Sequence, residues 1–128
     1  MSTDKTPRGT KSSGHFEWTI KGVNFHTEQI YIWHEGPNIQ INGYFDFAGP
    51  NQKIMTVLID RDTPGEEQTF DPPTWLKEVS YQADSGSAYA ITGKYAATLN
   101  KHTKQYKLSF DLLFGGVLSI QCKLDVSE

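Results

Sequence analysis

The chain has 128 residues, a formal net charge of −3 at pH 7 and a single cysteine. A chain of this length folds as one domain and buries about two-thirds of its unfolded surface, so its stability requires neither disulfides nor a structural metal. A net acidic domain is poorly suited to nucleic acid, because neutralisation of phosphates supplies most non-specific affinity. The composition therefore excludes a disulfide scaffold and argues against a nucleic-acid-binding protein.

The first 14 residues are polar and predict a flexible tail. They are rich in Ser, Thr, Gly and Lys, and such a segment buries too little apolar surface to offset the entropy lost on ordering. It has no apolar stretch typical of a secretory signal, and no run in the chain approaches the ~20 apolar residues of a membrane span. We therefore expect a tail over residues 1–14 and one folded domain over residues 15–128, in the cytoplasm and away from membranes.

Two strands are predicted at the start of the domain. Over residues 16–20 apolar and polar side chains alternate, which is typical of a strand with one buried face. Residues 25–35 form a second strand in which both faces carry bulk: isoleucines fall on one face, and Tyr31 and Trp33 fall on the other. The second strand is therefore covered on both sides, or one of its faces meets a ligand or partner.

Two Gly-Pro-Asn triplets, at residues 36–38 and 49–51, predict turns that bracket a third strand. Proline presets the first central turn position and asparagine tolerates a left-handed conformation at the second. Within this third strand Gly43 suggests a bulge, which would change the face that the following aromatic residues address. Residues 53–60 are almost continuously apolar and predict a central strand.

Residues 60–73 contain three prolines and five carboxylates and predict an acidic loop. Their spacing resembles a calcium loop, but Pro64 removes the fifth-position ligand and Asp71 replaces the usual glutamate. We therefore expect a solvated loop without a metal. The next residues, up to position 82, fit either a short helical turn or a strand.

The C-terminal part, from Ser87 onward, predicts three antiparallel strands that form a meander. Turn-forming sequences lie at residues 100–103 and 115–116. Cys122 falls in phase with the apolar positions, and we expect a buried thiol. Every second position is apolar in Tyr89, Ile91, Tyr95 and Leu99, in Tyr106, Leu108, Phe110, Leu112 and Phe114, and in Leu118, Ile120, Cys122, Leu124 and Val126.

These elements predict an all-β fold of about seven to nine antiparallel strands. Short turns join the strands and no long helix is convincing, so the chain builds either a β-sandwich or a small closed β-barrel. Periodicity does not separate the two, because each presents one apolar face per strand.

Motifs for catalysis, cofactors and metals are weak. His26 and Glu28 share a face and could ligate one metal, but His15 and His102 can join them only if the fold is assumed. No nucleophile elbow and no glycine-rich phosphate loop is present in the sequence. The sequence therefore leaves any catalytic residues unknown, and we predict no cofactor and no metal.

The face of Tyr31 and Trp33 is the best candidate for a ligand site. Aromatic rings stack on the apolar edges of sugars, and amides satisfy hydroxyl pairs, so this mixture suits a carbohydrate. The chain is therefore predicted to be a non-catalytic binding module, and its candidate residues are Tyr31, Trp33, Tyr44, Asn38, Gln40 and Asn42.

Two alternative functions remain open. The chain could be a small barrel enzyme, an isomerase or cyclase that acts on a hydrophobic molecule in its lumen, or it could be a structural subunit. A possible homodimer contact is the flat face that bears Ala88, Ala90 and Ala96, because alanine is rare on solvated strands.

Overall fold

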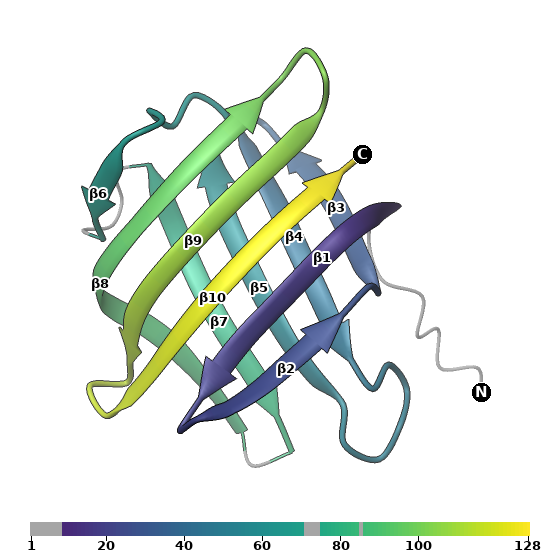
Figure 1. Cartoon of the computed structure of the whole chain (residues 1–128), viewed down its shortest axis with the longest axis vertical. Helices are drawn as coiled ribbons and strands as arrows, with labels where there is room; N and C mark the ends of the chain where they lie inside the picture. The colour runs from purple at the N-terminus through teal and green to yellow at the C-terminus, as the bar shows by residue number, and fades with distance from the viewer. Residues whose placement is uncertain (1–8, 71–74, 85) are drawn as a thin grey trace.

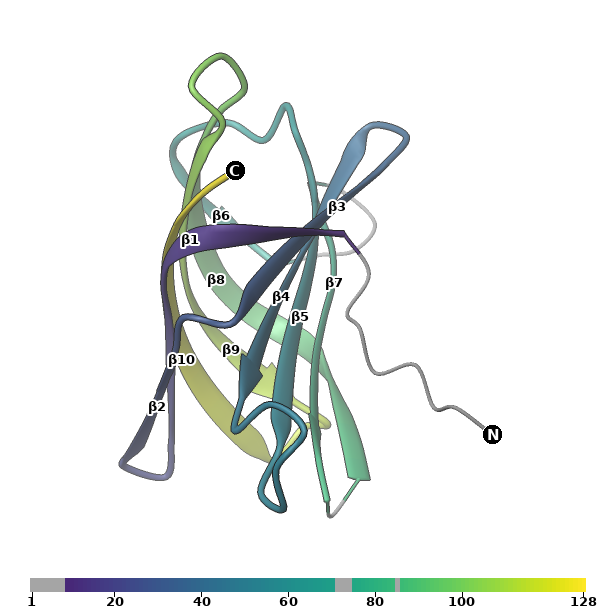
Figure 2. The ribbon, with the colours of Figure 1, turned by 90° about the vertical axis from the view of Figure 1, so that its right-hand side faces the viewer.

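The computed structural model describes residues 9–70, 75–84 and 86–128, whose strands form a closed antiparallel β-barrel (Figures 1 and 2). Eight strands close the barrel, and the short strands β2 and β6 extend it. The all-β prediction is confirmed, and of the two predicted architectures the barrel is the one observed. The described residues contain no helix, and therefore no helical segment that could cross a bilayer.

The strands follow the chain in order. They are β1 (Thr10–Ile20), β2 (Val23–Thr27), β3 (Ile30–Glu35), β4 (Asn38–Phe45), β5 (Lys53–Asp60), β6 (Glu67–Thr69), β7 (Leu76–Ala83), β8 (Gly86–Asn100), β9 (Gln105–Phe114) and β10 (Leu118–Ser127).

Strand β1 closes the barrel by pairing on both of its edges. Its partner β10 is matched from Ser13 opposite Ser127 to Ile20 opposite Ile120, and its other edge pairs with β2 and β3. All other barrel strands pair with their neighbours in chain order, which is an up-and-down arrangement. The predicted C-terminal meander corresponds to β8, β9 and β10 and is confirmed.

The barrel is flattened into two layers. Figure 1 shows β8, β9, β10 and β1 in front, crossing β7, β5, β4 and β3 behind. Strands β1 and β8 take part in both layers, and each contains a glycine at positive φ, Gly14 at 126° and Gly93 at 139°. A Cβ on Gly14 would collide with the carbonyl oxygen of Asp125, and one on Gly93 with that of Asp111. The two glycines therefore allow close strand contact where the sheet turns its corners.

The interior is filled by apolar side chains. Along β9 and β10 every second residue is buried, as the period of two predicts. Trp18, Tyr95 and Tyr106 are among the largest fully buried side chains. Cys122 is buried, as expected, and burial first and the Glu17 carboxylate second raise the pKa of its thiol well above the ordinary value. The described interior is thus a packed core.

The predicted tail, residues 1–14, extends too far along the chain, because β1 already begins at Thr10. Residues 10–14 belong to β1, where Thr10, Lys11 and Ser12 pair with β3, and Ser13 and Gly14 pair with β10. The sequence concealed this part of the strand because its residues are polar on both faces. Residues 1–8 lie outside the described part of the chain.

The predicted phase of β8 is wrong in its first half. Tyr89 and Ile91 are 56% and 55% exposed, whereas Ala88 and Ala90 pack against the core. A register shift between Ala90 and Thr92 reverses the alternation, so that Tyr95 points inward as predicted. Ala96 consequently lies on the opposite face from Ala88 and Ala90, so the three alanines predicted for the dimer contact do not share one face.

The predicted bulge at Gly43 is also wrong. The pairing of β4 runs without interruption through Gly43, which faces Ile30 on one side and Met55 on the other. Its missing side chain instead makes room for the buried ring of Phe16, since a Cβ there would lie 2.8 Å from the Phe16 Cδ2 atom.

The middle of the chain contains more strand than expected. Within the predicted acidic loop, β6 pairs with β8. The segment that fitted either a helical turn or a strand forms β7, which pairs with β5 and β8. Residues 71–74, where the helical turn would have begun, lie outside the described residues.

We expect Gly43→Ala to destabilise the barrel by roughly 1–3 kcal/mol, the usual cost of overpacking a close-packed core. Gly65→Ala is the matched control, because the new Cβ would lie 3.8 Å from the nearest atom, at ordinary contact distance. Urea denaturation of both variants measures the difference. Equal unfolding free energies would contradict the packing of Phe16 over Gly43.

Deletion of residues 1–14 should lower the melting temperature by about 4 °C or more, the shift that corresponds to roughly 1 kcal/mol in a domain of this size. The deletion removes the pairing of β1 with β3 and its first two pairs with β10. Deletion of residues 1–8 leaves β1 whole and isolates the strand's contribution. An unchanged melting temperature in the longer deletion would show that residues 10–14 do not stabilise the closure.

Candidate functional site

Strands β3 and β4 place the six predicted ligand residues on the outside of the barrel. Isoleucines alternate with them and are buried in the interior. The register sets Tyr31 opposite Asn42 and Trp33 opposite Gln40. The predicted residues Tyr31, Trp33, Asn38, Gln40 and Tyr44 are half-buried, whereas Asn42 is only 4% exposed.

Three aromatic rings form a continuous cluster on this face. The Tyr31 and Tyr44 rings meet edge to face with centroids 5.8 Å apart, and the Tyr44 and Phe47 rings do so at 5.2 Å. This geometry suits the quadrupoles of aromatic rings and holds them in fixed orientations. Burial first and the neighbouring Tyr31 second raise the pKa of the Tyr44 phenol. Its hydroxyl can both donate and accept a hydrogen bond.

A pocket of about 350 Å³ opens beside this aromatic cluster. It combines two rings with an amide and a carboxylate, and it is lined by Tyr44, Phe47, Ala48, Gly49, Gln52 and Asp84. A tight turn shapes its floor, because Asp46 accepts hydrogen bonds from the backbone of Gly49 and Asn51, and Gln52 accepts one from Ala48. Phe47, Gln52 and Asp84 were not predicted, since they are far apart in sequence or outside regular strands.

The predicted amides differ in what they can offer a ligand. Gln40 Nε2 donates to Asn42 Oδ1 at 3.4 Å, so the buried Asn42 serves to orient Gln40. The Asn38 Oδ1 atom is buried and accepts no hydrogen bond from the described residues. Of the three amides, Gln40 is therefore the one placed to contact a molecule on this face.

The acidic loop engages its carboxylates in internal contacts. Asp60 Oδ1 accepts a hydrogen bond from the Asp62 backbone, and Asp62 forms an ion pair with Lys101 at 2.6 Å. The hydrogen bond and charge of Lys101 lower the pKa of Asp62. These contacts place two of the loop's described carboxylates in a network of surface contacts.

A polar network at one end of the barrel joins β3 and β9 to the residues that directly follow β5 and β10. The Glu128 carboxylate meets His34 Nε2 at 2.6 Å and accepts a hydrogen bond from the Tyr106 hydroxyl at 2.9 Å. His34 Nδ1 also lies 3.2 Å from Arg61 Nη1. Because a guanidinium can only donate, Nδ1 accepts there and Nε2–H donates to Glu128. His34 thus belongs to a different network from His26 and Glu28.

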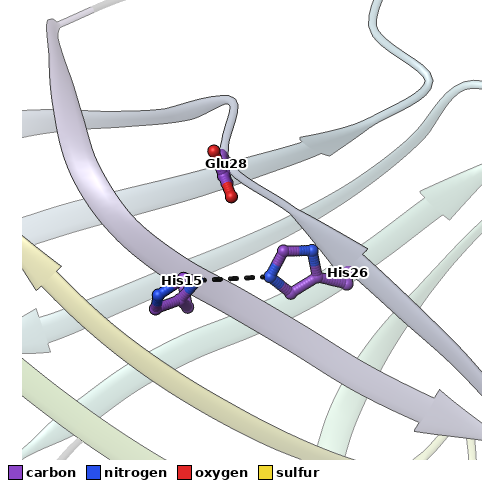
Figure 3. Close-up of side chains that lie close together, drawn as sticks. All are labelled: His15, His26 and Glu28. Carbon is purple, nitrogen blue, oxygen red and sulfur yellow. Dashed lines mark hydrogen bonds between the residues drawn. The ribbon is translucent and has the colours of Figure 1, made fainter.

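The structure does bring His15 to His26 and Glu28. His15 Nδ1 lies 3.3 Å from His26 Nε2, and both side chains are exposed, as is Glu28 (Figure 3). The hairpin between β1 and β2 creates this proximity by setting Phe16 opposite Thr27 and Glu17 opposite His26. The sequence signal that could have found it is the two-residue turn at Lys21-Gly22, which fixes the hairpin register.

Comparisons with protein-family models, with curated proteins and with solved structures find no match to this chain. The geometry of the sites described above therefore carries the functional information.

Tyr106 makes the stability of the barrel decrease at alkaline pH. Burial, followed by the hydrogen bond and charge of Glu128, raises the pKa of Tyr106 to about 12. Because the folded state favours the neutral phenol, its contribution is complete below the ordinary tyrosine pKa of about 10 and is lost as the pH rises through about 12.

We therefore expect the free energy of unfolding to fall between pH 10 and pH 12, and to fall less in Tyr106→Phe. Urea denaturation across this range measures both curves. Tyr44, Tyr81 and Tyr95 also have raised pKa values, mainly through burial, and remain in both proteins. Parallel curves for wild type and Tyr106→Phe would contradict the assignment.

Proposed function

We propose that this protein is a non-catalytic binding module that recognises a carbohydrate on the outer face of β3 and β4. The observation that carries the proposal is the aromatic cluster of Tyr31, Tyr44 and Phe47 beside an open pocket. Three ordered rings at the surface of a barrel whose core is already filled add little to core packing, and they offer flat apolar faces to a ligand.

The polar groups around the cluster favour a sugar over a purely apolar ligand. Gln52 and Asp84 line the pocket, and Gln40 lies on the adjoining surface. An amide both donates and accepts, and a carboxylate accepts two hydroxyl hydrogens, so together they match neighbouring hydroxyl groups. Binding sites for small molecules commonly combine apolar walls with a few such polar groups.

The alternative of an enzyme with a lumen has less support. Such an enzyme needs an enclosed, ligand-sized cavity with convergent polar groups. The described interior is instead occupied by one cluster of apolar side chains, including Trp18, Phe16 and Phe114, all 1% exposed or less. A filled barrel favours recognition on the outer surface.

The proposal is tested by glycan-array binding of the wild type and of Tyr44→Ala and Trp33→Ala. Both residues are half-buried on the outer face, so each substitution should cost about 1 kcal/mol of stability, roughly half the value for a fully buried side chain. Loss of an aromatic contact should weaken glycan binding by at least about tenfold.

Tyr89→Ala is the matched control, because Tyr89 is an exposed aromatic residue on β8, outside this face. Its glycan binding should equal that of the wild type. Absence of glycan binding by the wild type, or equal losses in Tyr44→Ala and Tyr89→Ala, would overturn the proposal. A Trp33→Ala chain that does not fold would place Trp33 in the core and remove it from the site.

A further inference from the structure

We propose that His15, His26 and Glu28 bind a divalent transition-metal ion, with Zn²⁺ as the best fit. One nitrogen from each histidine and one carboxylate oxygen lie within 4.8 Å of one another. The site lies on β1, β2 and the bend after β2, and it shares no residue with the aromatic cluster or its pocket. The proposed metal site is therefore separate from the proposed carbohydrate site.

The distance between the two histidines fits a shared metal. Two ligands at about 2.05 Å from zinc, separated by the tetrahedral angle, lie about 3.3 Å apart. The His15 Nδ1 and His26 Nε2 atoms are 3.3 Å apart. A Glu28 carboxylate oxygen lies within 4.8 Å of both histidine nitrogens, and Glu28 completes the set by moving toward them, which an exposed side chain can do by changing rotamer.

The backbone holds two of the three ligands in place before any ion binds. His15 lies in the middle of β1, where it pairs with Asp125 of β10, and the β1–β2 hairpin begins at the next residue and is matched over five residue pairs. The bend that carries Glu28 is fixed by Lys11 Nζ, which donates to the Glu28 carbonyl oxygen at 3.0 Å, and by the Thr27 hydroxyl, which accepts from the Gln29 backbone. Ligands on rigid elements keep their geometry better than ligands on loops.

The surroundings suit a cation with an open coordination position. Beside the histidines lies a pocket of about 330 Å³ that is also lined by Glu17, Asp125 and Lys123. Glu17 is the register partner of His26, and Asp125 is the partner of His15. With Glu28, these three carboxylates offset the ammonium groups of Lys11 and Lys123, and that of Lys107, which pairs with Asp125 at 3.9 Å. The balance of −3 plus 3, or zero, leaves no net positive charge to oppose a cation. Three protein ligands leave the fourth tetrahedral position to water or to an exchangeable ligand.

The donor set decides the class of metal. Imidazole nitrogens suit zinc, copper and nickel, whereas Ca²⁺ and Mg²⁺ require cages of oxygen ligands. Two histidines and one carboxylate therefore select a borderline transition metal. The same two nitrogens form a hydrogen bond when no ion is bound, and a metal replaces that single bond with two coordination bonds.

The test is calorimetric titration of the full chain with ZnCl₂ near neutral pH, together with melting curves in Zn²⁺ and in chelator. We expect one Zn²⁺ per chain, a higher melting temperature in Zn²⁺ and, with Co²⁺ as a probe, the visible absorption of a tetrahedral ion. His15→Gln and His26→Gln should each weaken Zn²⁺ binding at least tenfold, and Glu28→Gln should weaken it less.

His102→Gln is the matched control, because His102 is an exposed histidine in the β8–β9 turn and its side chain is not part of the cluster. It should bind Zn²⁺ like the wild type. Absence of binding at about 100 µM Zn²⁺, where a site with a micromolar dissociation constant would be nearly full, would overturn the proposal. Equal binding by the wild type and by folded His15→Gln and His26→Gln chains would overturn it as well. Circular dichroism establishes that each variant is folded.

Discussion

The pairing of β1 with β10 is the constraint on which the rest of the structure depends. Without it, the strands would form an open sheet with two unpaired edges, which are prone to pair with other chains. The same strand carries Phe16 and Trp18 into the core and His15 to the outer surface. One strand therefore closes the barrel, supplies two of the largest core side chains and presents the first ligand of the proposed metal site.

Much of the fold could be predicted because most strands bury only one face. Strands β9 and β10 alternate strictly, so their positions and inward faces follow from the sequence. Strand β8 could not be predicted in full, since its register shift and the positive φ of Gly93 reverse the alternation halfway along the strand. The start of β1 was missed for a different reason. This segment is held in the sheet by backbone pairing, and its polar side chains show no apolar alternation that would predict a strand.

The candidate sites show the same limit at the level of side chains. Alternation along β3 and β4 is enough to place Tyr31, Trp33 and Tyr44 on one outer face. It does not reveal that Asn42 is covered, nor that Gln52 and Asp84 reach the pocket beside Tyr44, because those facts depend on how loops pack across strands. The cluster of His15, His26 and Glu28 is partly predictable, since the short turn of the β1–β2 hairpin fixes which residues of the two strands are neighbours.

Gly14 and Gly93, the glycines at the bends of β1 and β8, also limit how the interior of this barrel can change in evolution. By bending β1 and β8 sharply, Gly14 and Gly93 bring the front and back layers into face-to-face contact, with the side chains of each layer filling the space between them. Smaller core residues would therefore open isolated voids and not a continuous channel along the barrel axis. A barrel with a ligand-sized interior could evolve from this chain only if the bends of β1 and β8 at these glycines became less sharp. The outer surface, in contrast, can acquire new binding specificities one residue at a time while the core stays unchanged.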